Sequence, residues 1–210
     1  MLKAEPEALR RVLDALEASG LLLHADSALS SVTTLVAGEP IRGSWWGHPR
    51  GHAIFRALVA LDDHPDVLAA RLVSGKVTYV HRRLWPALAA VACAGEPWQT
   101  KGLSAAARAL LARVRKGRLR TDRLPKGRGR GASKATGEAA REVERRLLVR
   151  SEEVHTETGA HAKWLETWEE WARRAGLDAA SMPVSRAKAE LKNALRALDP
   201  SGKARLPWAP

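Results

Sequence analysis

The chain is 210 residues long, which suits one domain or two compact ones, and its 45% of hydrophobic residues are enough to form a buried core. Lys and Arg outnumber Asp and Glu by 35 to 23, which gives a net charge of +12. No apolar run approaches the roughly 18 residues of a membrane span and no signal peptide follows the charged start at Met1–Arg11, so we expect a basic, cytoplasmic protein with no membrane partner.

Helices dominate the prediction for the start of the chain. Leu9, Val12, Leu13 and Leu16 recur at the spacing of one helical face, and Gly20 is a suitable end for that helix. The expected elements are a helix at Glu5–Ser19, an apolar segment favoured as helix at Leu21–Ala37, a loop rich in Gly and Pro at Gly38–Pro49, and a helix at His52–Leu61.

A β-hairpin is predicted next. Val67–Val73 and Val77–His81 flank the turn residues Ser74-Gly75-Lys76, and the second segment is rich in residues typical of strands. A helix capped by Asp66 is the alternative for the first segment. A buried helix is then predicted at Arg82–Ala94.

The break at Gly95–Pro97 marks the expected end of the first module, and the second half follows in a clear order. The expected elements are a helix at Leu103–Val114 that begins at Ser104, a short helical turn at Leu119–Leu124, a polar link at Pro125–Ser133, a helix at Thr136–Leu147, strands at Leu148–Val154 and Ala162–Trp168 around the turn Thr158–Ala160, and a helix at Ser185–Leu198. A wholly helical Trp164–Arg174 is an alternative.

The positive charge is concentrated in one quarter of the chain. Residues 1–100 carry ten basic and ten acidic side chains, residues 151–210 carry nine of each, and residues 101–150 carry sixteen basic and four acidic. A concentrated excess attracts a polyanion, and the planar guanidinium suits phosphate oxygens. Three glycines alternate with cations in Lys126–Gly131, which allows close approach to phosphates.

The residues expected to contact nucleic acid are Arg113, Arg115, Lys116, Arg118, Arg120, Arg123, Lys126, Arg128, Arg130, Lys134, Arg141, Arg145 and Lys163. A solvated basic loop without a partner is the alternative interpretation of this charge.

Residues 103–168 resemble the winged-helix (helix-turn-helix) DNA-binding modules in their order of helix, short helix, basic link, helix and hairpin. The fragment EAAREVERRLLVRSEEVHTETGAHAKWLETW carries the resemblance, since an amphipathic helix runs directly into a polar hairpin. The resemblance implies that the helix enters a DNA major groove and that the hairpin touches the backbone or the minor groove. The residues it implies to face the bases are Lys134, Glu138, Arg141, Glu142 and Arg145. The glutamates, Glu144 included, depart from a strongly basic recognition helix, which argues against specific readout more than against binding.

Eight of the ten aromatic residues are tryptophans. Trp45 and Trp46 lie in the predicted loop, where they either stack on unpaired bases or fix the loop to the core. Trp164, Trp168 and Trp171 have the spacing of one helical stripe, which we expect to pack against the basic module.

Motifs for metal binding and catalysis are few. His48, His52, His64 and His81 are a conceivable metal cluster, but there is no HExxH motif and Cys93 is a single thiol, so we expect no metal and no cofactor. Walker A, GxGxxG and GxSxG motifs are absent from the sequence. The fragments GSWWGHPRGHAIF and DHPDV…SGKVTYVHRRLWPALAAVA resemble a family of small, uncharacterised bacterial proteins, which implies no activity.

We therefore expect a mainly α protein with small β-hairpins (α+β). Its parts are a helical module with a hairpin at residues 1–97, a basic winged-helix-like module at residues 98–178, and a C-terminal helix and tail at residues 179–210. The expected function is non-catalytic binding of duplex DNA at the nucleoid, with the first module used for packing, for dimerisation or as a second contact surface.

Three alternatives stay open. One is a DNA-repair enzyme of the base-excision glycosylase type, which would use Asp62-Asp63 as acid–base groups and Trp45-Trp46 as a wedge. The others are an RNA-binding protein, because arginine-rich segments also order on RNA, and a transcription regulator whose first half senses a small ligand.

Overall fold

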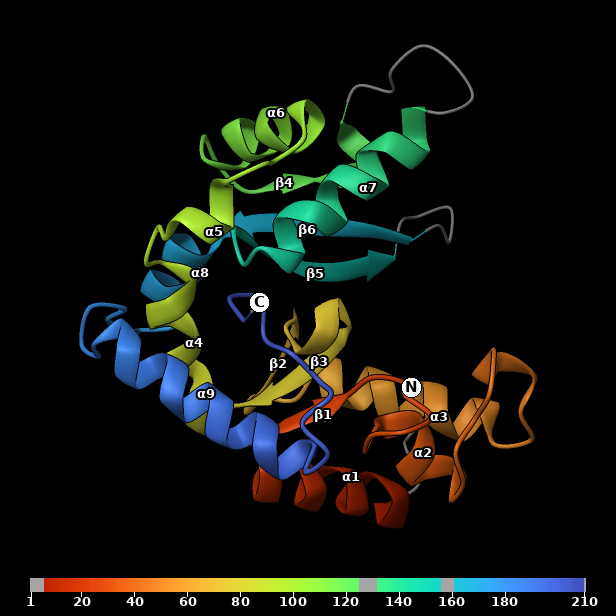
Figure 1. Cartoon of the computed structure of the whole chain (residues 1–210). Helices are drawn as coiled ribbons and strands as arrows, with labels where there is room; N and C mark the ends of the chain where they lie inside the picture. The colour runs from red at the N-terminus through yellow and green to blue at the C-terminus, as the bar shows by residue number, and fades with distance from the viewer. Residues whose placement is uncertain (1–5, 125–131, 156–160, 210) are drawn as a thin grey trace. The chain divides into compact units, whose positions relative to one another are not determined.

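A computed structural model describes residues 6–124, 132–155 and 161–209 of the chain. The chain forms two compact units, which we call the first unit (residues 1–85 and 188–209) and the second unit (residues 86–187). Each unit combines helices with a small three-stranded antiparallel sheet, which confirms the expected mixture of helices and short strands (Figure 1). No helix in the described residues is both long and apolar enough to cross a membrane.

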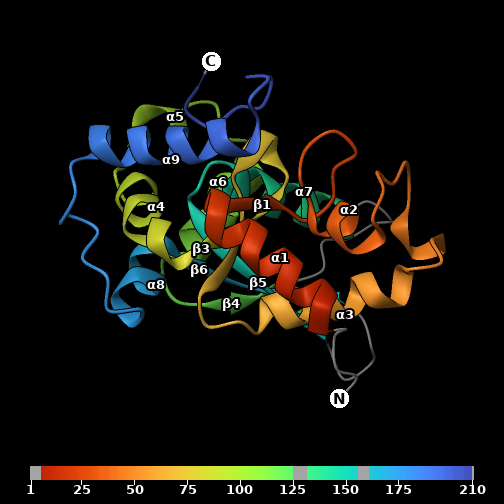
Figure 2. The ribbon, with the colours of Figure 1, turned by 90° about the horizontal axis from the view of Figure 1, so that it is seen from below.

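The sheet of the first unit has the strand order β1-β3-β2. Tyr79 occupies its centre and pairs with Leu22 on one side and with Ala69 on the other. Three helices share one hydrophobic core with this sheet, and Figure 2 shows them next to one another. The elements are α1 (Pro6–Ser19), β1 (Leu21–Leu23), α2 (Val32–Ala37), α3 (Gly51–Asp62), β2 (Val67–Arg71) and β3 (Val77–His81).

The helix expected over Leu21–Ala37 is wrong for its first half. Gly20 adopts φ +80, which ends α1, and Leu21–Leu23 then form a fully buried strand paired with β3. Burial on both faces of the sheet explains why this short run is apolar throughout instead of alternating. Helix resumes only after Ser31, whose hydroxyl accepts a hydrogen bond from the backbone N–H of Thr34 and caps α2.

The loop expected at Gly38–Pro49 contains one 3₁₀ turn, η1 (Trp45–Gly47). The hairpin β2–β3 is confirmed, so the helical alternative for its first strand is wrong. A 3₁₀ turn, η2 (Val73–Gly75), joins the two strands, and Ser74 adopts φ +50 there. The expected buried helix at Arg82–Ala94 consists of a 3₁₀ turn, η3 (Arg82–Leu84), and α4 (Trp85–Ala92).

The sheet of the second unit has the strand order β4-β6-β5. α6 and α7 pack against each other and against this sheet (Figure 1), and Leu111, Val143 and Leu165 belong to their shared core. The elements are α5 (Pro97–Thr100), α6 (Ala105–Val114), β4 (Leu119–Arg120), η4 (Thr121–Arg123), α7 (Ala132–Arg145), β5 (Val149–His155), β6 (His161–Thr167) and α8 (Trp168–Arg174). α9 (Val184–Leu198) confirms the last expected helix and belongs to the first unit from Lys188 onward.

Most expectations for the second half are confirmed. Ser104 caps α6 by accepting a hydrogen bond from the N–H of Ala107, and both strands of the hairpin are present as β5 and β6. α7 begins at Ala132, four residues before its predicted start. The expected turn at Thr158–Ala160 and residues 125–131 of the expected link lie outside the described residues.

One expectation for the second half is confirmed only in part, by the turn η4 at Thr121–Arg123, and one alternative is wrong. The segment Leu119–Leu124 is not a single helical turn, because Leu119 and Arg120 pair with β6 before the 3₁₀ turn η4 begins. The wholly helical alternative for Trp164–Arg174 also fails, since Trp164 lies in β6 and helix starts at Trp168.

Candidate nucleic-acid interface

Cations gather where α6 ends. Arg113, Arg115 and Lys116 are exposed there, while Val114 between them is buried in the core. Positive charge at this position stabilises the helix, because its last carbonyl groups carry partial negative charge. Gly117 then adopts φ +150, a conformation that side chains disfavour, and leads the chain into β4.

A row of paired residues crosses the sheet next to these cations. Arg120 of β4 lies opposite Trp164 of β6, and Trp164 lies opposite Glu152 of β5, so all three project from the same face. Arg118 joins this row from just before β4. The guanidinium carbons of Arg118 and Arg120 lie 4.6 and 5.8 Å from the centroid of the Trp164 ring, within the range of cation–π attraction.

Two carboxylates hold these guanidiniums beside the ring. Arg118 donates a hydrogen bond to Glu152 at 3.0 Å, and Arg120 donates two to Asp122 at 3.1 and 2.9 Å. The hydrogen bonds from Arg120 lower the pKa of Asp122 below its ordinary value. The two pairs orient the arginines and neutralise part of their charge.

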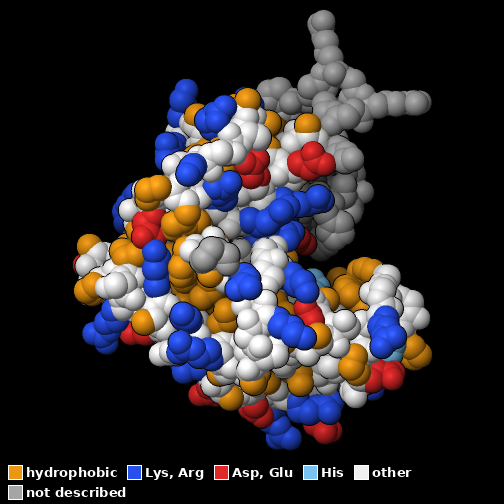
Figure 3. Space-filling model, viewed as in Figure 1, with side chains coloured by type: hydrophobic (Ala, Val, Ile, Leu, Met, Phe, Trp, Pro, Cys, Tyr) orange, Lys and Arg blue, Asp and Glu red, His pale blue; other side chains and the backbone are white. Residues whose placement is uncertain are grey.

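A hollow of about 510 Å³ opens beside Trp164, and we call it the arginine pocket. Five of the nine described residues that line it are Lys or Arg, and none of them is acidic. Arg113, Lys116 and Arg123 are exposed and form no salt bridge within the described part of the chain. Lys and Arg side chains also spread over α6 and the strands beneath it in Figure 3. The lining residues are Arg113, Lys116, Gly117, Arg118, Leu119, Arg120, Arg123, Leu124 and Trp164.

α7 supplies a second set of exposed cations. Arg141 and Arg145 lie one helical turn apart on its exposed face, together with the exposed Glu138. Glu142 has a structural role instead of a base-facing one, because its carboxylate accepts hydrogen bonds from the N–H and the hydroxyl of Ser104 at 2.9 and 2.6 Å. These bonds tie α7 to the start of α6, and they lower the pKa of Glu142 below its ordinary value.

Lys163 is engaged by the protein itself. Its Nζ lies 2.8 Å from a carboxylate oxygen of Glu144, which is only 2% exposed, so this lysine joins β6 to α7. Lys134 lies in α7, but its side chain is outside the part of the chain that the structure describes. Three other predicted contact residues also lie outside that part: Lys126, Arg128 and Arg130.

The strand predicted at Ala162–Trp168 is confirmed for Trp164, which lies in β6, so the helical stripe expected from the spacing of Trp164, Trp168 and Trp171 is wrong. Trp168 and Trp171 are buried in α8 with ring centroids 5.3 Å apart. Alternation supports the strand, because Ala162, Trp164 and Glu166 project from one of its faces. The sequence did not indicate the pairing of Trp164 with Arg120.

Trp45 and Trp46 of the first unit have different surroundings, so one indole fixes the loop and the other is exposed. The rings of Trp45 and Trp46 stack with centroids 4.2 Å apart. Trp45 packs on the core, whereas 61% of Trp46 is exposed, with Phe55 beside it at 5.5 Å. The loop is therefore fixed to the core by one indole and presents the other to solvent.

Asp62, Asp63 and Cys93 each have a defined place in the described part of the chain. No three His, Cys, Asp or Glu residues of the described chain are placed to hold a metal ion. Asp62 accepts a hydrogen bond from the hydroxyl of Tyr79 at 3.3 Å, and Asp63 ends α3. Burial, reinforced by the charge of Glu169, raises the pKa of Cys93 to about 12, so this thiol is not ionised at neutral pH.

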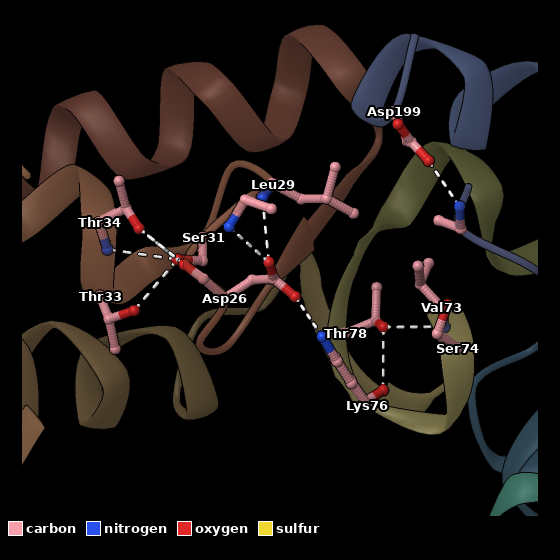
Figure 4. A network of polar contacts seen from close by, with 12 residues as sticks. Asp26, Leu29, Ser31, Thr33, Thr34, Val73, Ser74, Lys76, Thr78 and Asp199 are labelled. Atoms are coloured by element: carbon pink, nitrogen blue, oxygen red, sulfur yellow. Dashed lines mark hydrogen bonds and ion pairs between the residues drawn. The ribbon is translucent and has the colours of Figure 1, made fainter. Parts of the chain in front are cut away.

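A second hollow, of about 430 Å³, lies within the first unit, and several of its polar groups are paired within the protein (Figure 4). Asp26 accepts hydrogen bonds from Lys76 and from the N–H groups of Ala28 and Leu29. Burial alone would raise the pKa of Asp26, but these bonds outweigh it and lower the pKa. Asp199 accepts from the N–H and hydroxyl of Ser201 and holds the turn after α9.

Comparisons with family models, with curated proteins and with solved structures found no match to this chain.

Proposed function

We propose that the second unit binds nucleic acid, and duplex DNA in preference, with the end of α6, β4 and η4 as the main contact surface and the exposed face of α7 as a second one. The arginine pocket and its surroundings carry the proposal. Arg113, Lys116 and Arg123 are exposed, close together and without salt bridges among the described residues. Cations of this kind neutralise phosphates and release the counterions of the polyanion, which supplies most of non-specific affinity.

The order of elements supports a winged-helix-like arrangement of this unit. α6 is followed by the short turn η4, then by α7 and the hairpin β5–β6. In such a module α7 would enter the major groove, where its exposed Arg141 and Arg145 could reach base edges. The major groove of RNA is too narrow and deep for a helix, so this arrangement favours DNA over RNA. A protein of this kind would act in the cytoplasm at the nucleoid.

A charge-removal experiment tests the proposal. The variant Arg113→Ala/Lys116→Ala/Arg123→Ala is titrated into a labelled 20-base-pair duplex of mixed sequence, with fluorescence anisotropy as the readout. Loss of three phosphate contacts at 0.1 M salt should weaken binding on the order of 100-fold. The matched control, Arg10→Ala/Arg11→Ala/Lys192→Ala, removes the same charge from exposed helix positions of the first unit and should change affinity less than about 3-fold.

Equal affinities of the two triple variants would contradict the proposal, because net charge alone would then explain binding. Competition with duplex RNA and with single strands completes the test. Duplex DNA should compete best, and stronger competition by either other probe would reassign the interface to that nucleic acid.

A further inference from the structure

The arginine pocket is an open hollow on the surface of the second unit. Its volume of about 510 Å³ is large enough to admit one nucleotide. The phosphates of a duplex can contact the exposed side chains of Arg113, Lys116 and Arg123, whereas an unpaired nucleotide at the end of a strand can also enter the hollow. The two kinds of ligand therefore share these cations.

The charge of the pocket favours a phosphate monoester over a diester. Arg118 and Arg120 share their charge with Glu152 and Asp122, while the other three lining cations have no salt bridge within the described residues. A phosphodiester carries one negative charge, and a terminal phosphate monoester carries about 1.5 to 2 at neutral pH, with three acceptor oxygens. The monoester uses more of these clustered donors.

Some of the residues that line the pocket have planar or apolar side chains. Trp164 lines it together with Leu119 and Leu124, and the guanidinium of Arg118 lies over the Trp164 ring. Aromatic rings and guanidinium planes are the surfaces on which unpaired bases stack. One hollow therefore contains both a stacking surface for a base, at Trp164 and Arg118, and a cluster of cations for a phosphate.

The helix dipole does not account for the cluster. It explains cations in the last turn of α6, such as Arg113, because the effect falls off within one turn. Arg118, Arg120 and Arg123 lie in β4 and η4 or immediately before them, beyond the reach of that effect. These three arginines line the same hollow, and no helix dipole explains their positions there.

We propose that the arginine pocket binds a nucleotide that carries a terminal phosphate monoester, with the base against Trp164 and Arg118 and the phosphate among Arg113, Lys116 and Arg123. The choice of ligand rests on the proposed function. The phosphorylated 5′ end of a strand and a free nucleotide share this chemistry, and the experiment separates them.

The experiment compares two eight-residue DNA strands of one sequence, labelled at the 3′ end, with either a phosphate or a hydroxyl group at the 5′ end. The phosphorylated strand should bind about 10-fold more tightly to the full chain. Adenosine monophosphate should displace it, whereas adenosine should not. Calorimetry with adenosine monophosphate alone then shows whether a free nucleotide binds as tightly as the strand end.

Two variants locate the effect. Trp164→Leu removes the stacking surface, with Trp46→Leu, at the exposed indole of the first unit, as the matched control. Arg123→Ala removes one cation that forms no salt bridge among the described residues. It lies in an exposed 3₁₀ turn, so this variant tests the pocket even if Trp164→Leu unfolds the sheet. Both pocket variants should reduce the preference for the 5′ phosphate to less than about 3-fold, and the control should keep it.

The outcomes separate this inference from the proposed function. Equal affinity for the two strands, with no competition by adenosine monophosphate, would overturn the pocket while salt-dependent duplex binding kept the proposed function. Binding of adenosine monophosphate without any binding of strands or duplex would overturn the proposed function and establish the pocket as a free-nucleotide site. A preference that survives both pocket variants would place the phosphate elsewhere and overturn the inference.

Discussion

The carboxylate of Glu142 accepts hydrogen bonds from both the backbone N–H and the hydroxyl of Ser104, at 2.9 and 2.6 Å. Ser104 is the N-cap of α6, so a side chain of α7 completes the capping of its neighbouring helix. The orientation of α7 on α6 thus depends on a residue that the winged-helix resemblance implied as a contact to bases.

Glu142→Ala should therefore lower stability instead of changing the nucleic-acid preference. We expect a loss of about 1 kcal/mol in the free energy of unfolding, measured by urea denaturation. Because the folded-state pKa of Glu142 is below its ordinary value of 4.5, this contribution is present above that pH and is lost as the pH falls through the lowered pKa. Glu17→Ala, at an exposed position of α1, is the matched control and should cost less than about 0.5 kcal/mol.

Lys163 and Glu144 should behave as a structural pair. Lys163→Met leaves a carboxylate that is 2% exposed without its ammonium partner, and we expect a loss of about 2 kcal/mol in thermal or urea unfolding. The double variant Lys163→Met/Glu144→Gln should recover part of that loss, because the buried group is then neutral. A single variant as stable as the native chain, but with weakened binding of nucleic acid, would show that Lys163 serves the ligand instead.

Gly20 is required where α1 turns into β1. It has φ +80, and a Cβ there would lie 2.7 Å from Cδ1 of Leu84 and 2.9 Å from Nη2 of Arg83. Gly20→Ala should cost about 2 kcal/mol or more, from backbone strain and steric overlap together. Gly38→Ala separates the two causes, because Gly38 has φ +85 with open space around its Cβ and should lose only about 1 kcal/mol. Equal losses would show that the overlap is relieved at no cost.

Arg141 and Arg145 should affect selectivity more than overall affinity. Selection from a random pool of duplexes should enrich a short motif with the native chain, and Arg141→Ala/Arg145→Ala should lose that motif while retaining salt-sensitive binding. Base contacts of this type discriminate by about 1–3 kcal/mol each. Identical motifs from both chains would remove α7 from base recognition.

The sequence predicted the helices and hairpins well wherever local pattern and tertiary packing agree. The amphipathic α1, the capped start of α6 and the strands around residues 156–160 follow directly from spacing and turn residues. It failed for Leu21–Leu23, because burial on both faces of a sheet produces an apolar run without alternation. Such a run can be distinguished from a helix only by knowing its partner, β3.

The candidate interface was predictable in composition but not in geometry. The cluster of arginines is visible in the charge distribution, which identifies residues 101–150 as the candidate segment for binding a polyanion. The pairing of Arg120 with Trp164 is not visible, because it depends on the register between a two-residue strand and a strand more than forty residues later. Likewise, the capture of Lys163 by Glu144 and of Ser104 by Glu142 arises only when α7 packs on its neighbours.

The salt dependence of duplex binding tests the central claim most directly. With about six phosphates contacted, the logarithm of the association constant should fall against the logarithm of salt concentration with a slope near −5. Arg113→Ala/Lys116→Ala/Arg123→Ala should reduce that slope by about 3, and the first-unit control should leave it unchanged. A slope near zero in the native chain, or no binding at all at low salt, would contradict the account.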